Sequence, residues 1–179
     1  MNEVRPVKTA AYLGKAPSYA EELVAFLAGQ GKTLVLAESC TAGLAADFIV
    51  RIPGASQVFW GSFVCYLELA KQKMLGIPEE FLMEHGAVSV QTASAMAEKA
   101  LIISGASLSA SITGLAGPTG DNRVTPVGTV WTAYAWYDSQ GILKSSTAGF
   151  LFDAHQLSRN DIREASAAAA FEEILKRFQ

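Results

Sequence analysis

The sequence predicts an α/β fold in which a mixed sheet carries helices on both faces. Short apolar runs rich in β-branched and aromatic residues alternate with segments of helical periodicity along the first part of the chain, as expected for strands joined by helices. Two later runs, 127–137 and 142–149, flank Asp138-Ser139-Gln140-Gly141, which is typical of an antiparallel hairpin. The 179 residues are 50% hydrophobic and 17% charged, a composition that fits one globular domain.

The N-terminal part predicts two helix–strand pairs. Ser18 and Glu21 match the capping-box pattern, which begins the first helix at 18, and Gly31 ends it. Residues 1–17 are expected to form a loosely ordered extension to a domain that spans 18–179. The elements in order are a helix over 18–29, a buried strand over 33–37, a turn of small and polar residues over 38–43, a helix over 44–50 and an aromatic-rich strand over 57–67.

The remainder predicts three helices, a strand, a long loop, the hairpin and a closing helix. Ser89 is placed to cap the longest of the three helices. The loop over 114–126 contains three glycines and two prolines, which argue against regular structure there. The elements in order are short helices over 69–75 and 78–84, a helix from 89 to 103, a strand over 107–113, the loop, the two hairpin strands and an alanine-rich helix over 161–177.

Composition and charge exclude several functional classes. The formal charge is −3 and Lys and Arg form no cluster, which argues against nucleic acid as the main partner. No apolar stretch reaches the roughly 18 to 20 residues of a membrane-spanning helix, and residues 1–17 do not resemble a secretory signal. Two cysteines and two distant histidines predict neither a disulfide framework nor a metal site. We therefore expect a cytoplasmic protein with no membrane partner.

Ser39 is the first candidate for chemistry, because Glu38-Ser39-Cys40-Thr41 lies where a strand gives way to a helix. Unpaired N–H groups at a helix start can hold the oxyanion that forms when a serine attacks a carbonyl. Taken alone, the tetrapeptide favours a simpler interpretation, in which Ser39 or Thr41 caps the helix. A serine nucleophile also needs a base, and Lys71 would serve if burial lowered its pKa, with Tyr66 as orienting group or proton relay. Taken alone, Lys71 indicates a solvated helix residue and Tyr66 a half-buried aromatic residue.

Two other segments are candidates for ligand binding. The stretch 113–120 follows a strand, and its glycines and threonines would allow a ligand to approach the backbone and find hydroxyl donors, although turn formation explains it equally well. Arg159 and Arg163 have i, i+4 spacing, so they share a face if both are helical, and paired guanidinium groups suit a phosphate. They could equally be a pair of surface arginines beside Asp161 and Glu164.

Several motifs in register resemble the CinA C-terminal domain family. The resemblance covers about residues 18 to 178, nearly the whole chain, and its motifs keep the order and the spacing of the family. They are Ala37-Glu38-Ser39-Cys40-Thr41, Pro53-Gly54-Ala55-Ser56, Glu84-His85-Gly86-Ala87-Val88-Ser89, Thr113-Gly114-Leu115-Ala116-Gly117-Pro118 and Pro126-Val127-Gly128-Thr129-Val130-Trp131.

The resemblance implies a three-layer α/β/α sandwich, often assembled as a homo-oligomer, and an activity. The family includes amidohydrolases that convert nicotinamide mononucleotide to nicotinic acid mononucleotide and ammonia without a cofactor or a metal. By this resemblance the catalytic residues are Ser39 as nucleophile, with Tyr66 and Lys71, and the partner is a small nucleotide substrate. Substrate-binding positions implied by the resemblance and by the turn and loop are Cys40, Thr41, Gly43, Ser56, Thr113, Gly114, Ala116, Gly117, Arg159 and Arg163.

The chain also departs from the family pattern near the expected base. Glu68 and Leu69 stand where the family has asparagine and glutamate, and a carboxylate at 68 is expected to pair with Lys71 and raise its pKa. Ala42 replaces a glycine, and Leu157-Ser158-Arg159 replaces Gly-Asp-Arg. These changes keep open a non-catalytic relative that binds a nucleotide or a protein partner. An amidase with a different substrate and an enzyme that uses the Cys40 thiol also stay open.

Overall fold

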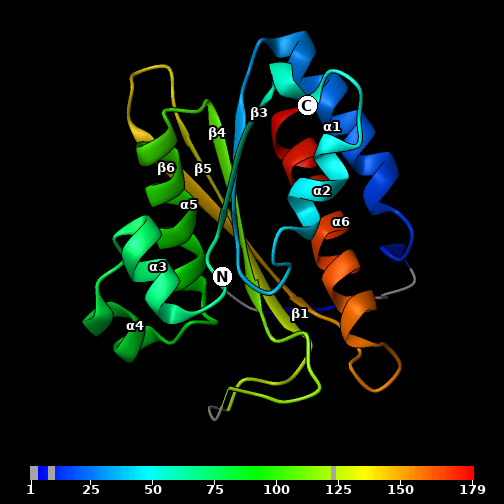
Figure 1. Cartoon of the computed structure of the whole chain (residues 1–179), viewed down its shortest axis with the longest axis vertical. Coiled ribbons are helices and arrows are strands. Elements are labelled where there is room, and N and C mark those ends of the chain that lie inside the picture. Colours follow the sequence, from blue (N-terminus) through cyan, green and yellow to red (C-terminus); the bar gives the residue numbers. More distant parts are fainter. Residues whose placement is uncertain (1–3, 8–10, 122–123) are drawn as a thin grey trace.

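The computed structural model describes residues 4–7, 11–121 and 124–179. Within these ranges six strands form one mixed sheet in the order β1-β6-β5-β4-β2-β3, between two layers of helices (Figure 1). Helices α1, α2 and α6 cover one face, and α3, α4 and α5 cover the other (Figure 1). The three-layer α/β/α fold predicted from the sequence is therefore confirmed. Two predicted segments, the N-terminal extension and the loop over 114–126, lie partly outside the described residues.

The bounds of most elements lie within two residues of the predicted ones. The strands are β1 (Val4–Pro6), β2 (Leu34–Glu38), β3 (Phe59–Val64), β4 (Leu108–Gly114), β5 (Thr129–Tyr137) and β6 (Leu143–Leu151). The helices are α1 (Ala16–Gln30), α2 (Leu44–Val50), α3 (Glu68–Leu75), α4 (Glu79–His85), α5 (Val90–Ser104) and α6 (Arg159–Phe178), with a short 3₁₀ turn at Ala55–Gln57.

The predicted capping box of the first helix is wrong. Helix α1 begins at Ala16, with Pro17 in its first turn, and the Ser18 hydroxyl donates to the Lys15 carbonyl instead of accepting from the backbone. Proline is favoured at this position because its N–H would have no partner in the helix anyway. The capping box of the protein lies at the start of α6, where Ser158 and Asp161 exchange hydrogen bonds.

The described residues of the N-terminal segment, 4–7 and 11–17, are more ordered than we expected. Strand β1 pairs in parallel with β6 at the sheet edge. The Tyr12 side chain is buried, packs edge-on against Phe150 and Phe152, and donates a hydrogen bond to Glu172 of α6. The expectation of a loose extension fails here because an apolar ring in this segment completes the core between the sheet and α6.

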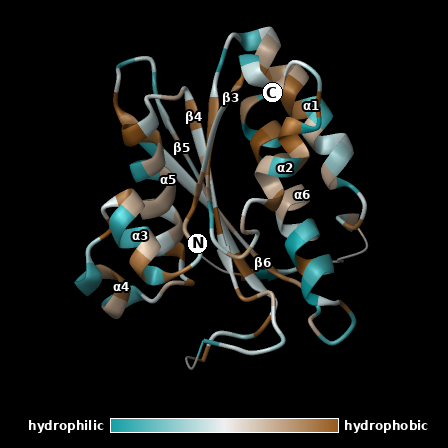
Figure 2. Ribbon diagram, viewed as in Figure 1, coloured by the Kyte–Doolittle hydropathy of each residue, from teal (hydrophilic) through white to brown (hydrophobic). Residues whose placement is uncertain are grey.

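The sheet is buried on both faces by amphipathic helices. All five residues of β2 are buried, as expected for a strand covered on each side. Hydrophilic and hydrophobic residues alternate along the helices (Figure 2), as expected for helices with one apolar side. The alanines of α6 are fully buried, and these small side chains allow α6 to pack closely on α1 and the sheet.

Strand β2 lies at the point where the sheet changes direction of winding. It pairs in parallel with β3 on one side and with β4 on the other. The chain leaves β2 through α2 on one face and returns to β4 through α3, α4 and α5 on the opposite face (Figure 1). The loops that follow parallel strands diverge at such a point and leave a crevice at the carboxyl ends, where open α/β sheets bind ligands.

Candidate active site

A pocket of about 600 Å³ lies at the carboxyl ends of β2, β3 and β4. Its walls come from the turn after β2, the start of α3, the loop before α5, the loop after β4 and the first residue of α6. The residues that line it are Ser39, Cys40, Tyr66, Leu67, Glu68, Lys71, Ala87, Val88, Gly114, Leu115, Ala116, Gly117, Thr119, Gly120, Asp121 and Arg159.

Ser39 is the first residue after β2 and opens into this pocket. Its backbone N–H donates to the Ile112 carbonyl of β4 at 2.9 Å, which fixes the residue at the end of the sheet. It does not cap α2, because the N-cap residue is Gly43 and makes no side-chain cap bond. The capping interpretation of Ser39 and Thr41 is therefore wrong, and the Ser39 hydroxyl is left to face the pocket.

Lys71 supplies the group that faces Ser39. Its Nζ lies 2.8 Å from Ser39 Oγ and 2.9 Å from the Cys65 carbonyl oxygen. The side chain is only 1% exposed although it carries an amine, and burial lowers the pKa of Lys71 below its ordinary value. A buried lysine with a lowered pKa loses its proton more easily, so its nitrogen can accept the proton of a neighbouring hydroxyl.

Glu68 does not form the ion pair with Lys71 that the sequence led us to expect. Within the described residues the amine of Lys71 bonds Ser39 and Cys65 instead. Glu68 raises the pKa of Lys71, but it is the weakest of the named influences and burial outweighs it. Leu69 is exposed on the outer side of α3. The two departures from the family pattern therefore leave the contact between Lys71 and Ser39 in place.

Glu38 supports the turn that carries Ser39, a contact that sequence reasoning missed. Its carboxylate is fully buried and accepts hydrogen bonds from the N–H groups of Gly43, Ala45 and Ala46 and from the Ser62 hydroxyl. A buried carboxylate is stable only when its oxygens are bonded in this way. The detectable signal is a lone acid at the end of an otherwise apolar strand, directly before Ser39.

The carboxylate of Glu38 changes which N–H groups are available to a ligand. Between positions 39 and 46, the backbone N–H groups of Cys40 and Thr41 donate to no described residue, whereas the other six have acceptors. At the start of α2 the N–H groups of Ala45 and Ala46 are thus occupied by Glu38, and that of Leu44 by the Thr41 carbonyl. Two donors remain next to Ser39, on residues that are themselves buried.

Arg163 lies behind this turn and not in the pocket. Its Nε donates to the Cys40 carbonyl at 3.2 Å and its Nη2 to the Thr41 carbonyl at 2.8 Å, while Nη1 donates to Asn160. All three nitrogens of the guanidinium group are therefore occupied by protein atoms. The structure does not place Arg163 among the residues that line the pocket.

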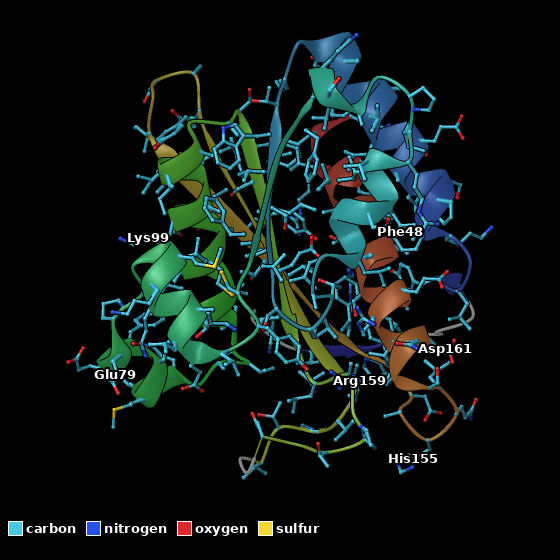
Figure 3. All side chains as sticks on the ribbon, viewed as in Figure 1. Phe48, Glu79, Lys99, His155, Arg159 and Asp161 are labelled. Carbon is cyan, nitrogen blue, oxygen red and sulfur yellow. The ribbon has the colours of Figure 1, made fainter. Side chains whose placement is uncertain are left out.

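Tyr66 and Arg159 form the opposite wall. Arg159 donates from Nη2 to the Tyr66 hydroxyl at 2.7 Å and from Nη1 to the Gly117 carbonyl, so its guanidinium group spans the pocket edge. The side chain extends from the start of α6 toward the loop after β4 (Figure 3). The hydroxyl of Tyr66 bonds Arg159, and no hydrogen bond joins it to Ser39 or Lys71 among the described residues.

A larger cavity of about 930 Å³ adjoins this wall from the outside. It shares Ala116, Gly117 and Arg159 with the Ser39 pocket, so these three residues separate the two spaces. Its remaining walls are mostly apolar and come from the ends of β1 and β6, from the loop between β4 and β5 and from the loop that leads into α6.

Besides Arg163, four of the expected substrate-binding residues lie outside the pocket. Ser56 is exposed beside a separate hollow at 50–59. Thr113 is buried and its hydroxyl donates to the Ala87 carbonyl at 2.7 Å, which supports the loop before α5. Thr41 is fully buried, and the N–H of Gly43 is bonded to Glu38. Gly114, Ala116 and Gly117 of the glycine loop do line the pocket.

The two thiols near the pocket are poor nucleophiles. Burial raises the pKa of Cys40 to about 12, although Lys71 acts in the opposite direction. Burial likewise raises the pKa of Cys65 to about 11. At these pKa values both thiols are protonated near neutral pH. The reactive form of a cysteine is the thiolate, which is therefore scarce here. This argues against an enzyme in which Cys40 carries the chemistry.

Metal-binding clusters and membrane spans are both absent from the described residues. They hold no group of three or more His, Cys, Asp or Glu side chains arranged to bind a metal ion. Among the helices that the structure describes, none has the length and apolar character required to span a bilayer.

Sequence comparisons identify relatives over most of the chain. The family model described as CinA C-terminal domain matches residues 16–178. A CinA-like protein of Akkermansia muciniphila is 47% identical over 119 residues, which make up 66% of this chain and 29% of the relative. A CinA-like protein of Geobacter metallireducens is 42% identical over 147 residues, or 82% of this chain and 34% of the relative. The chain thus spans about a third of the length of these relatives.

Solved structures agree with this result. The competence/damage inducible protein CihA from Agrobacterium tumefaciens is similar with a TM-score of 0.82 and 34% identity, covering 94% of this chain and 98% of that one. A competence-damaged protein (CinA) superfamily protein from Escherichia coli is similar with a TM-score of 0.82 and 28% identity, covering 90% of this chain and 89% of that one.

Proposed function

The chain belongs to the CinA C-terminal domain family, and on this basis we propose that it hydrolyses the amide of nicotinamide mononucleotide. The products are nicotinic acid mononucleotide and ammonia. The observation that carries the proposal is the buried contact of 2.8 Å between Lys71 Nζ and Ser39 Oγ, in a pocket at the carboxyl ends of parallel strands. A serine beside a buried lysine of lowered pKa is an activated nucleophile, which an amide hydrolase requires.

Acylation begins with Lys71 in its neutral form. Its Nζ accepts the proton of Ser39 as Oγ attacks the carboxamide carbon, and the carbonyl oxygen becomes an oxyanion. The unpaired N–H of Cys40, a residue that lines the pocket, donates to this oxyanion. Lys71 then gives the proton to the departing nitrogen, the C–N bond breaks, and ammonia leaves an ester between Ser39 and the nicotinoyl group.

Deacylation repeats these roles with water as the nucleophile. Neutral Lys71 accepts a proton from water, the hydroxyl attacks the ester carbon, and the bond to Ser39 Oγ breaks. The proton held by Lys71 returns to Ser39, and the carboxylate product is released. The Cys65 carbonyl accepts one N–H of the amine throughout and keeps Nζ directed at Ser39.

Arg159 gives a reason for preferring a phosphorylated substrate. Its guanidinium group lies on the pocket wall and bonds only neutral oxygens, those of Tyr66 and Gly117, among the described residues. A phosphate offers stronger, charge-assisted acceptors for the same nitrogens. Tyr66 contacts the substrate from this wall, and its hydroxyl is oriented by Arg159.

The test is ammonia release by the purified chain from the mononucleotide, the riboside and free nicotinamide. We expect turnover to be fastest with the mononucleotide and to disappear in Ser39→Ala, with Ser56→Ala as the matched serine control that keeps full activity because Ser56 lies outside the pocket. Undiminished ammonia release by Ser39→Ala would refute the assignment of the nucleophile. Binding of the mononucleotide without ammonia release would favour a non-catalytic relative.

A further inference from the structure

The pocket that holds Ser39 carries charges of both signs. Its charged lining residues are Glu68, Lys71, Asp121 and Arg159. In the proposed reaction Lys71 starts as a neutral amine, so the charges that a substrate meets are those of the two carboxylates and of Arg159. We infer that Glu68 is a specificity-determining residue, whose carboxylate selects a carboxamide attached to a positively charged ring; this inference rests on the proposed function.

Glu68 and Lys71 lie on the same side of α3. Their i, i+3 spacing on this helix makes the two side chains neighbours, with about 5–6 Å between Cβ atoms. Lys71 reaches Ser39 Oγ, and Glu68 lines the same pocket one turn nearer the start of the helix. The charge of Glu68 is felt at the amine, because it raises the pKa of Lys71. A ring beside the reacting carbonyl group therefore lies within range of the same charge.

The carboxylate of Glu68 is available to a ligand. Among the described residues it accepts no hydrogen bond and forms no ion pair, and the guanidinium group of Arg159 is bonded to Tyr66 and Gly117 instead. In this it differs from Glu38, whose buried carboxylate is held by four donors. A ligand that enters the pocket thus meets an unpaired negative charge close to Ser39.

The ring of the proposed substrate has the complementary charge. In nicotinamide mononucleotide the ring nitrogen is bonded to ribose, so the ring is a pyridinium cation, whereas free nicotinamide is neutral. Hydrolysis turns the carboxamide into a carboxylate, and the ring unit of the product then carries no net charge. Attraction by Glu68 therefore favours an N-substituted ring over the free base, and the substrate over the product. The phosphate is left to Arg159.

Glu68 could instead have a purely structural role. It is the acid in the first turn of α3, where a negative charge stabilises the helix dipole. That role gives no preference between two ligands, so selectivity for ring charge distinguishes the two roles. Suitable ligands are the mononucleotide and its reduced dihydronicotinamide form, which has a neutral ring but the same carboxamide, ribose and phosphate.

The test measures the Kd of both ligands by isothermal titration calorimetry in the Ser39→Ala background, where no turnover occurs. The ring-charge selectivity is the Kd of the reduced form divided by that of the cationic form. We expect it to fall by about 3–10-fold when Glu68→Gln is added, and to stay near its original value with Glu68→Asp, which keeps the charge. Glu79→Gln, which removes a charge from an exposed position of α4 outside the pocket, should leave it unchanged.

Each outcome separates this inference from the proposed reaction. Unchanged selectivity in Glu68→Gln overturns the inference, and so does an equal fall in Glu79→Gln, because the net charge of the protein would then explain the effect. Selectivity that depends on Glu68, in a protein that releases no ammonia when Ser39 is present, supports the inference while the proposed reaction fails. Ammonia release without such selectivity keeps the reaction and removes the role of Glu68. Failure of both ligands to bind contradicts the inference and the proposed substrate together.

Discussion

Lys71 Nζ lies 2.8 Å from Ser39 Oγ, and the two residues come from different elements that follow neighbouring parallel strands. Ser39 follows β2 directly, whereas Lys71 belongs to α3, which the chain enters after β3. Lys71 is only 1% exposed, so its amine is largely withdrawn from bulk solvent. The chemical consequence of the contact depends on whether the amine carries a proton, which makes pH the most direct probe of this pair.

Replacement of Lys71 by methionine is expected to abolish activity and to raise stability at neutral pH. Activity should fall by about 10²–10⁴-fold, because the general base is removed. The variant Lys73→Met, which changes an exposed lysine of the same helix, should keep its activity. Ammonia release and thermal unfolding of the three proteins measure both effects, and a Lys71→Met enzyme with wild-type kcat would contradict the role of the base.

The pH dependence of the same variant has a definite sign. The pKa of Lys71 is lower in the folded protein than its ordinary value of 10.5, so the unfolded chain binds the proton more readily. Wild-type stability therefore rises with pH from the folded pKa up to about 10.5. The advantage of Lys71→Met over the wild type should shrink across this window. In the wild type, log kcat should fall with a slope near one as pH drops below the pKa of Lys71 in the substrate complex.

Cys40 should be dispensable for the reaction. Its pKa of about 12 leaves the thiol protonated at neutral pH. Cys40→Ala is expected to retain kcat within a few-fold, and iodoacetamide should modify both cysteines of the native protein far more slowly than those of the unfolded chain. Mass spectrometry of the alkylated protein checks the second statement. Loss of activity in Cys40→Ala at unchanged thermal stability would revive the thiol mechanism.

Glu38→Gln should destabilise the protein although it changes only one atom. If the amide oxygen keeps the bonds to Gly43 and Ala45, the NH₂ group faces the Ala46 N–H, and a buried donor is left without an acceptor. We expect a loss of about 1–3 kcal/mol in the free energy of unfolding, measured by urea denaturation. Asp47→Asn makes the same change at an exposed position of α2 and should cost about 0.5 kcal/mol or less. Equal stability of Glu38→Gln and wild type would mean that the carboxylate does not hold the turn.

Ala42→Gly should stabilise the protein. Ala42 has φ of 50°, in the left-handed region where a Cβ costs about 1–2 kcal/mol. Glycine removes this strain but loses about 0.5–1 kcal/mol through the greater freedom of the unfolded chain. The net gain is about 0.5–1 kcal/mol, measured by urea denaturation. Ala46→Gly, in the ordinary helical part of α2, should lose about that amount, and a loss in both variants would show that Ala42 is not strained.

Much of the architecture could be predicted because it depends on local patterns. The bounds of α2 at 44–50 follow from a short apolar helix closed by Pro53-Gly54, and the hairpin follows from its turn residues. Strand β1 could not be predicted, because its three residues become a strand only by pairing with β6 more than 140 positions away. The capping box was assigned to the wrong helix, since Ser158 and Asp161 show the same pattern as Ser18 and Glu21.

The candidate site, like the fold, could be predicted from the sequence only in part. Motif register predicted Ser39, Lys71 and the glycine loop as neighbours, and the structure brings them into one pocket. Most partners of Glu38 and Arg163 are backbone groups, which have no sequence signature, so these contacts could not be predicted. The pairing of Tyr66 with Arg159 joins residues 93 positions apart and depends on where α6 begins.

The helices that follow β2 and β3 lie on opposite faces of the sheet (Figure 1), and this arrangement affects how the candidate site can be disrupted. Lys71 stands on the helical layer of one face and Arg163 on the layer of the other, and both bond the short turn at the end of β2. Proteins in general also open by local unfolding, which costs less free energy than global unfolding. Detachment of either layer disconnects the turn while most of the sheet remains hydrogen-bonded. We therefore expect Ser39 to react only while both helical layers are packed on the sheet.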